Sequence, residues 1–258
     1  MTQQQIERII KSTVHIVMTN PFTREPESGG SGCIIDYNKT EVLLTVAHVT
    51  NMDAATCIDI GEPTVNNQNK VYSVGAMNYL ESFDLNRYNA QISQLQTNSG
   101  RIEEKNFGLI DFSFAKLEHK TNYLQCKIEF NDFTIQSGSK LRIKSDLTDV
   151  PDPTAQYGFF GRIKSELGYI NNILTLSVNE VFYGGLKYIR KIGHYYEFQL
   201  PNQINSHTDF RGTSGAPIMD TNGNLLSLVT HGYEGADKLY GIALADFKVG
   251  VDATLLTN

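Results

Sequence analysis

The chain is a succession of short β-prone runs separated by turn-forming residues, and this pattern limits its fold more than any other feature. Runs rich in Val, Ile, Tyr, Phe and Thr alternate with Gly, Asn, Asp and Pro, as in 14–18, 41–46, 109–117, 195–200 and 225–229. Runs of this kind are typical of strands bounded by turns. Because no long helices alternate with them, the pattern predicts an all-β barrel or sandwich rather than an α/β fold.

Local signals add detail to this pattern. Three isoleucines recur at helical spacing close behind Thr2, a residue that can cap a helix, namely Ile6, Ile9 and Ile10. They predict one short N-terminal helix. The dipeptide Asn222-Gly223 predicts a hairpin turn, since both residues tolerate positive φ. The tract 52–106 is polar and rich in Asn and Gln, and is expected to hold little regular structure.

Composition excludes several classes of protein. Hydrophobic residues make up 40% of the 258 residues, enough for a packed core and too many for extended disorder. The net charge of −6 argues against binding nucleic acid, which depends on a positive face. No apolar run has the ~18–20 residues of a membrane span, and the N-terminus lacks the pattern of a secretory signal. A cytoplasmic protein with no nucleic-acid or membrane partner is therefore expected.

The cysteines and histidines point away from disulfide and metal chemistry. The three cysteines, Cys33, Cys57 and Cys126, are odd in number, far apart and without CxxC spacing. A disulfide framework would need an even and denser set, and a zinc site would need paired ligands. We therefore expect free thiols, no metal and no cofactor.

The sharpest chemical signal is the run Gly212-Thr213-Ser214-Gly215-Ala216-Pro217 ahead of an apolar segment. When a serine attacks a carbonyl, negative charge builds on the carbonyl oxygen, and backbone N–H groups must point at it. Glycines beside the serine permit the backbone that aims those N–H groups. A glycine-rich turn without chemistry is the alternative. The esterase motif G-x-S-x-G does not fit, because Ala216 stands where its last glycine belongs.

Two upstream residues match what such a serine needs. His48 follows the strand-like run 41–46, and an imidazole must take the proton of a serine nucleophile. Asp111 lies inside an apolar run, where a carboxylate is costly unless it accepts hydrogen bonds, for instance from an imidazole N–H. Asp53 and Asp84 are other candidate acids. A core histidine and a loop or capping aspartate are the alternatives for the two residues taken singly.

Together these segments resemble the chymotrypsin/trypsin-like serine peptidases. Thr45-Val46-Ala47-His48 is similar to the family's T-A-A-H, the run 111–117 to its D-[IL]-A-L-[LI]-K-L, and 212–217 to its G-D-S-G-G-P. The order His, Asp, Ser is also the family's. Gly30-Ser31-Gly32-Cys33-Ile34 resembles its G-[ST]-G-[FV]-[LI], and Thr230-His231-Gly232 its S-W-G strand.

The resemblance implies two packed antiparallel six-stranded β-barrels, over 1–125 and 126–258, with the catalytic residues between them. His48 would be the general base and acid, Asp111 would orient it, and Ser214 would be the nucleophile. The N–H groups of Gly212 and Ser214 would form the oxyanion hole. Thr208 and Asp209 would lie at the base of the substrate pocket, with walls contributed by Thr230, His231, Gly232 and Gly241.

Departures from the family pattern narrow the expectation. Thr213 replaces the aspartate that pairs with a newly cut N-terminus in zymogen-activated members, so maturation by such a cut is not supported. The usual disulfides are missing, as in intracellular bacterial or viral-type members. Asp209 either points into the pocket, favouring Arg or Lys in the substrate, or hydrogen-bonds within its loop.

The expected function is that of a serine endopeptidase acting on a protein or peptide substrate through an acyl-enzyme. A partner protein that is processed, or that restrains the activity, is also expected. Two alternatives remain at this point. One is a trypsin-fold binding or regulatory module without turnover, and the other is an esterase that uses the same residues.

Overall fold

The computed structural model describes residues 1–50, 53–61, 71–83, 107–130, 132–170, 173–204 and 212–257. Strands dominate this part of the chain, joined by three α-helices and a 3-10 helix, so the all-β prediction is confirmed. Among the described residues, no helix is long and apolar enough to cross a membrane. The described strands form two large structures, a sheet mainly from the N-terminal half and a barrel from the C-terminal half, and two short two-stranded ladders.

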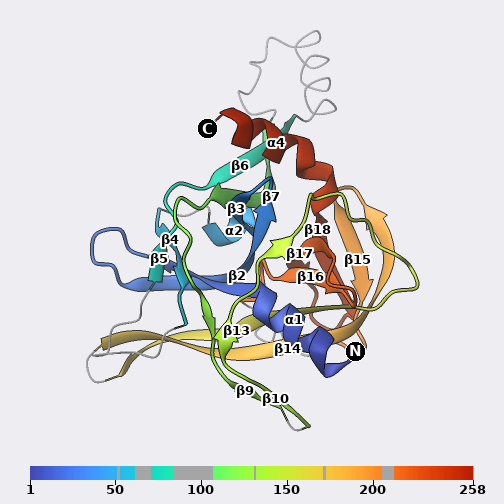
Figure 1. Cartoon of the computed structure of the whole chain (residues 1–258), viewed down its shortest axis with the longest axis horizontal. Coiled ribbons are helices and arrows are strands. Elements are labelled where there is room, and N and C mark those ends of the chain that lie inside the picture. Colours follow the sequence, from blue (N-terminus) through green and yellow to red (C-terminus); the bar gives the residue numbers. More distant parts are fainter. Residues whose placement is uncertain are drawn as a thin grey trace, which may run out of the picture.

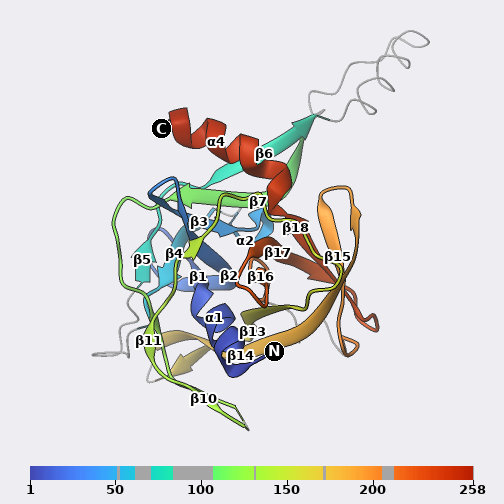
Figure 2. The same cartoon turned by 45° about the vertical axis from the view of Figure 1, so that its right-hand side comes forward.

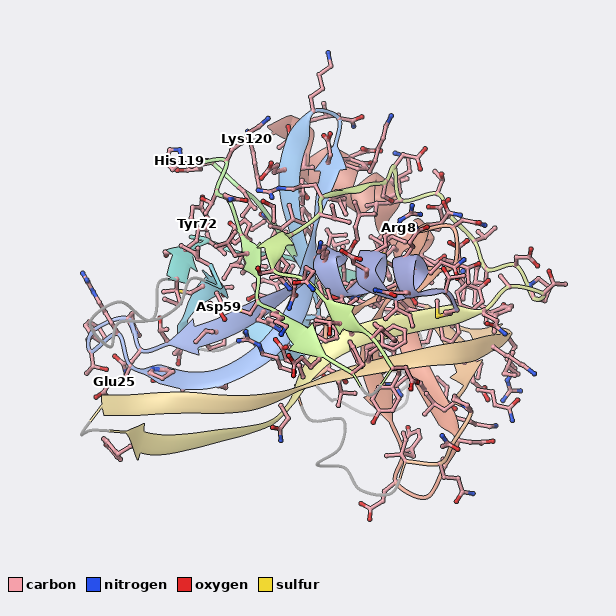
Figure 3. The ribbon with its side chains drawn as sticks, turned by 60° about the horizontal axis from the view of Figure 1, so that its bottom comes forward. Arg8, Glu25, Asp59, Tyr72, His119 and Lys120 are labelled. Atoms are coloured by element: carbon pink, nitrogen blue, oxygen red, sulfur yellow. The ribbon has the colours of Figure 1, made fainter. Side chains whose placement is uncertain are left out.

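The N-terminal helix α1 (Gln3–Ser12) forms as its sequence predicts. Thr2 caps it by a reciprocal pair of hydrogen bonds: the Gln5 N–H donates to the Thr2 hydroxyl, and the Thr2 N–H donates to Oε1 of Gln5 at 2.7 Å. The buried face of α1 includes Ile9 and Ile10. This face packs against the C-terminal half, where Arg8 donates a hydrogen bond to the carbonyl of Asn222 (Figure 3).

In the N-terminal half the described strands form an eight-stranded sheet, where the resemblance implied a six-stranded barrel. Its path is β5-β4-β1-β2-β3-β7-β6, with β12 pairing alongside β2. The strands are β1 (Thr13–Thr19), β2 (Pro26–Tyr37), β3 (Thr40–Thr45), β4 (Ala55–Asp59), β5 (Val71–Ser73), β6 (Asn78–Phe83), β7 (Phe107–Lys116) and β12 (Ile143–Lys144). No pairing among the described residues joins β5 to β6, so closure into a second barrel is not established.

The extra strand has a simple cause in the length of β2. That strand pairs with β1 only as far as Cys33, whereas its pairing with β3 continues to Tyr37. The edge left free beyond β1 is taken by β12, through the parallel pair Ile143 and Ile35. Strands β4, β5 and β6 lie within the tract 52–106, for which little regular structure was predicted; most of the rest of this tract lies outside the described residues.

The C-terminal half is a closed six-stranded barrel in the order β13-β14-β15-β18-β17-β16. Its strands are β13 (Tyr157–Ile170), β14 (Ile173–Ile192), β15 (Tyr195–Gln199), β16 (Pro217–Asp220), β17 (Leu225–Gly232) and β18 (Lys238–Ala243). The pair Tyr157 and Asp220 closes the ring between β13 and β16. The predicted hairpin turn follows β16, with Gly223 at φ 92°. The β13–β14 hairpin extends past the barrel toward the N-terminal sheet (Figure 1).

Short elements connect the two structures. Two-stranded ladders pair β8 (Leu124–Gln125) with β11 (Gly138–Ser139), and β9 (Ile128–Glu129) with β10 (Thr134–Ile135). The chain ends with the 3-10 helix η2 (Leu244–Phe247) and with α4 (Lys248–Thr257), which crosses β6 and β7 (Figures 1 and 2). Lys248 of α4 donates to the hydroxyl of buried Tyr37 in β2 at 2.8 Å. Each terminal helix therefore packs on the opposite half, and the predicted division at residue 125 stays a prediction.

Candidate active site

His48 and Asp111 meet because of the register between β3 and β7. Thr45, the last residue of β3, pairs with Ser113 of β7. The strands are antiparallel, so Asp111, two residues before Ser113 in β7, lies level with the short helix α2 (Ala47–Thr50) that follows β3. Nδ1 of His48 is 2.9 Å from each carboxylate oxygen of Asp111, and the backbone N–H of His48 donates to Oδ1 at 3.0 Å.

The surroundings of Asp111 keep it ionised. Partial burial acts to raise the pKa of its carboxyl, but the side-chain and backbone hydrogen bonds from His48, and the charges of His48 and His231, outweigh this. The pKa of Asp111 therefore lies below its usual value. An ionised carboxylate only accepts hydrogen bonds, so Nδ1 of His48 carries the proton and Nε2 is left as an acceptor. Among the described acids, Asp111 is the one in contact with His48; Asp84 lies outside this part of the chain.

Ser214 stands in a tight loop just before β16. The N–H of Gly215 donates to the carbonyl of Val229 at 2.8 Å, and the hydroxyl of Ser214 contacts the carbonyl of Thr230 at 3.4 Å. Gly215 has φ 85°, and a Cβ there would lie 2.0 Å from the carbonyl oxygen of Ser31. Only glycine fits this position, which explains the glycine that follows the serine.

Glycine also brings the two halves together at the site. A Cβ on Gly30 would lie 2.6 Å from the Val49 side chain and 3.4 Å from the carbonyl oxygen of Ser214. Gly30 therefore separates the residue after His48 from the candidate nucleophile, with no room for a side chain between them. The N–H of Ser31 then donates to the carbonyl of Ser214 at 2.9 Å. The G-S-G motif of the sequence thus lies at the contact between the halves.

The predicted pocket residues divide into two groups. Thr208 and Asp209 lie outside the described residues. The others lie on β17 and β18, where Thr230 is buried, His231 is exposed, and Gly241 pairs with Val229. Whether they line a substrate pocket stays a prediction.

His231 is surrounded by aromatic residues that the sequence did not single out as a group. Its ring stacks on Tyr240 with centroids 4.8 Å apart, and it meets Tyr195 and Tyr233 edge-on. The Thr230 hydroxyl donates to the Tyr240 carbonyl at 2.9 Å, so the Nδ1–H of His231 donates to that hydroxyl at 3.0 Å. Partial burial lowers the pKa of His231, against the opposing effect of the Asp111 charge.

Cys33 of β2 is not a rival nucleophile to Ser214. Cys33 is fully buried, and burial raises the pKa of its thiol, which makes it unreactive. Cys33, Cys57 and Cys126 are all free. Among the described residues, no three His, Cys, Asp or Glu side chains are placed to hold a metal ion.

The barrel, the sheet and their junction define the fold of the chymotrypsin-like serine proteases. Similar solved structures include human heparin binding protein, at 12% identity and a TM-score of 0.57 over 98% of this chain and 94% of that one. The scabies mite inactivated protease paralogue S-D1 is similar at 10% identity and 0.56, over 96% and 94% of the chains. The serine endoprotease from Yersinia pestis is similar at 14% identity and 0.52, over 100% and 68%.

At such identities the likeness establishes the fold and not the activity. One of these neighbours is named as an inactivated protease paralogue and another as an endoprotease, so this fold accommodates both. No protein-family model matches the sequence, and no curated protein matches it either. What the chain does must therefore be argued from its own residues.

Proposed function

We propose that this protein is a serine endopeptidase in which Ser214 is the nucleophile, His48 the general base and Asp111 the residue that orients it. The observation that carries the proposal is the double contact of Nδ1 of His48 with the Asp111 carboxylate, at 2.9 Å to each oxygen. It fixes the tautomer in which Nε2 can accept a proton, the form that a general base requires.

The proposed reaction has two halves. Nε2 of His48 takes the proton of the Ser214 hydroxyl as Oγ attacks the substrate carbonyl carbon, and the N–H groups of Gly212 and Ser214 stabilise the oxyanion. His48 then gives the proton to the leaving amine as the C–N bond breaks, which leaves an acyl group on Ser214. A water molecule, deprotonated by His48, attacks the acyl carbon, and the serine is regenerated.

A binding module without turnover is the second candidate, and one observation favours it. The Ser214 hydroxyl contacts the Thr230 carbonyl at 3.4 Å, and among the described residues it has no hydrogen bond to His48. For the peptidase reaction the hydroxyl must rotate from Thr230 toward Nε2 when substrate binds. Catalytic hydrogen bonds are often long or misaligned in free enzymes and tighten only in the complex, so the contact does not exclude turnover.

Labelling with a fluorophosphonate tests the proposal, because the probe reacts with an activated serine. We expect mass spectrometry to find the label on Ser214 of the wild type, and no label on folded Ser214→Ala or His48→Ala. Absence of both label and peptide turnover in the folded wild type would overturn the peptidase and favour the binding module. Matched peptide and ester substrates separate a peptidase from an esterase, which would cleave the ester alone.

A further inference from the structure

Ser31 of β2 makes two hydrogen bonds to the loop that carries Ser214, residues 212–215. It belongs to the N-terminal half and is fully buried. Its N–H donates to the carbonyl of Ser214 at 2.9 Å, and its hydroxyl donates to the carbonyl of Gly212 at 3.0 Å. Its own carbonyl accepts from the hydroxyl of Thr45 at 2.7 Å. One residue thus binds the loop on both sides of Thr213 and is itself held by β3.

These contacts fix three successive carbonyl groups. The carbonyls of Gly212 and Ser214 are bound by Ser31, and that of Thr213 accepts from the N–H of Ala216 at 2.8 Å. In a trans peptide the N–H points opposite to the carbonyl of the same plane. Holding the carbonyl of Thr213 therefore fixes the N–H of Ser214. Holding that of Gly212 fixes the peptide between Gly212 and Thr213, which joins the two candidate oxyanion donors.

The N–H groups of Gly212 and Ser214 differ from these bound carbonyls. Among the described residues, no carbonyl or side chain accepts a hydrogen bond from either of them. Gly212 has φ 102°, a conformation that suits glycine, and a peptide beside glycine can rotate at little steric cost. The Gly212 carbonyl therefore depends on an outside donor to stay in place, and the hydroxyl of Ser31 is that donor.

We infer that Ser31 is a positioning residue, whose hydroxyl holds the peptide between Gly212 and Thr213 and so restrains the loop that presents the N–H groups of Gly212 and Ser214 to the developing oxyanion. This inference rests on the proposed peptidase function and adds a residue to it from the other half of the molecule. Ser31 itself touches neither the substrate nor the reacting atoms. Because Thr213 carries no charge, the loop is positioned here without an ion pair at that residue.

The test compares Ser31→Ala with a matched control, Thr13→Val. Thr13 is also buried, and its hydroxyl donates to one backbone carbonyl, that of Ile9, at 3.2 Å. A misplaced oxyanion donor weakens the transition state more than the bound substrate. For Ser31→Ala we expect kcat to fall by roughly 10- to 100-fold with KM unchanged within about twofold. Affinity for a peptide aldehyde, which forms a tetrahedral adduct, should fall in parallel. Thr13→Val should keep wild-type kcat and lose similar thermal stability.

The outcomes separate this inference from the proposed function. An active wild type together with an unchanged kcat in folded Ser31→Ala would overturn the role of Ser31 and leave the peptidase intact. Equal losses of kcat in Ser31→Ala and Thr13→Val would assign both residues to stability alone. An unlabelled, inactive wild type would overturn the peptidase itself. If Ser31→Ala does not fold, Ser31→Cys keeps the shape with a weaker donor. A kcat below that of the wild type at unchanged KM is then expected, and a wild-type kcat would overturn the role of Ser31.

Discussion

The two halves of the molecule support their site residues in different ways. In the N-terminal sheet, His48 lies on a four-residue helix, with its side chain 49% exposed and its ring held by one carboxylate. In the C-terminal barrel, Ser214 lies in a loop whose carbonyls are hydrogen-bonded in succession. The N-terminal arrangement leaves the His48 ring accessible on one side, whereas the C-terminal arrangement fixes the backbone around Ser214. A base must exchange protons with substrate and water, whereas oxyanion donors must not move, so each half has the support its proposed task needs.

The largest effect is expected from removing the site side chain that each half contributes, His48 from the N-terminal sheet or Ser214 from the C-terminal barrel. We expect Ser214→Ala and His48→Ala each to lower peptide turnover by about 10⁶-fold, since the groups act as a unit. The double variant should be no worse than either single one. Neither side chain belongs to the buried core, so both variants should fold, as circular dichroism can check. Wild-type turnover in either folded variant would remove the assignment.

A smaller change alters the support of His48 in the N-terminal sheet without changing the shape of the side chain that supports it. Asp111→Asn replaces a carboxylate by an amide that can donate to Nδ1 and so stabilises the wrong tautomer of His48. We expect kcat to fall by roughly 10⁴-fold with the fold unchanged. Steady-state kinetics on the purified variant measures this. An unchanged kcat would mean that another acid, such as Asp53, orients the histidine.

Substrate preference tests the predicted pocket residues of the C-terminal half, His231 and Asp209. Partial burial lowers the pKa of His231, so its ring is neutral at neutral pH and presents Nε2 as an acceptor. If His231 lines the pocket, small polar substrate side chains are favoured, and His231→Ala should change their cleavage by about 10- to 200-fold. Cleavage of a peptide library by the wild type, His231→Ala and Asp209→Ala measures this. A preference for Arg or Lys that is lost in Asp209→Ala would place the acid in the pocket instead.

Local sequence signals were sufficient for the features that depend on neighbouring residues. The cap at Thr2, the turn at Gly223 and the strand-rich pattern are all set by a few adjacent side chains. The contact between His48 and Asp111 was also predictable, because His48 follows one recognisable apolar run and Asp111 lies inside another. The family resemblance supplied their expected pairing.

Features set by long-range register were not predictable in this way. The pairing of β12 with β2 depends on where β1 ends, which no local signal reports. The 20-residue β14 contains Gly184 and Gly185, so its sequence looks like shorter strands divided by a turn. Ser31 was visible as part of a motif, but its hydrogen bonds join residues 181 positions apart.

A second junction between the halves, away from the site, is made of charged and titratable side chains, of which His15 and Lys140 are buried. Arg162 of β13 pairs with Asp59 of β4 at 2.8 Å, and Glu180 of β14 lies 3.6 Å from buried His15 of β1. Figure 3 shows Asp59 where the β13–β14 hairpin approaches the N-terminal sheet. Lys140 is buried in the same region, and its ammonium group donates to Gln125 at 2.6 Å. Charges in such a place are costly unless paired, so their titration should be coupled to folding.

Lys140 gives the smallest effect and the most direct test of this second junction. Burial lowers its pKa from 10.5 to about 7, with Arg162 acting in the same direction and Glu180 and Asp59 against it. Between these two values the unfolded chain binds a proton that the folded chain does not, so the free energy of unfolding must rise with pH, by at most about 1.4 kcal/mol per pH unit. Lys140→Met should abolish this rise and be stabilising relative to the wild type toward pH 7, where the buried charge costs most. Denaturant unfolding at pH 7, 8, 9 and 10 measures the difference, and Lys127→Met, at an exposed lysine, controls for the loss of one positive charge. Parallel profiles for the wild type and Lys140→Met would mean that the ammonium group of Lys140 reaches water. This junction would then be solvent-accessible, as the side chain of His48 is.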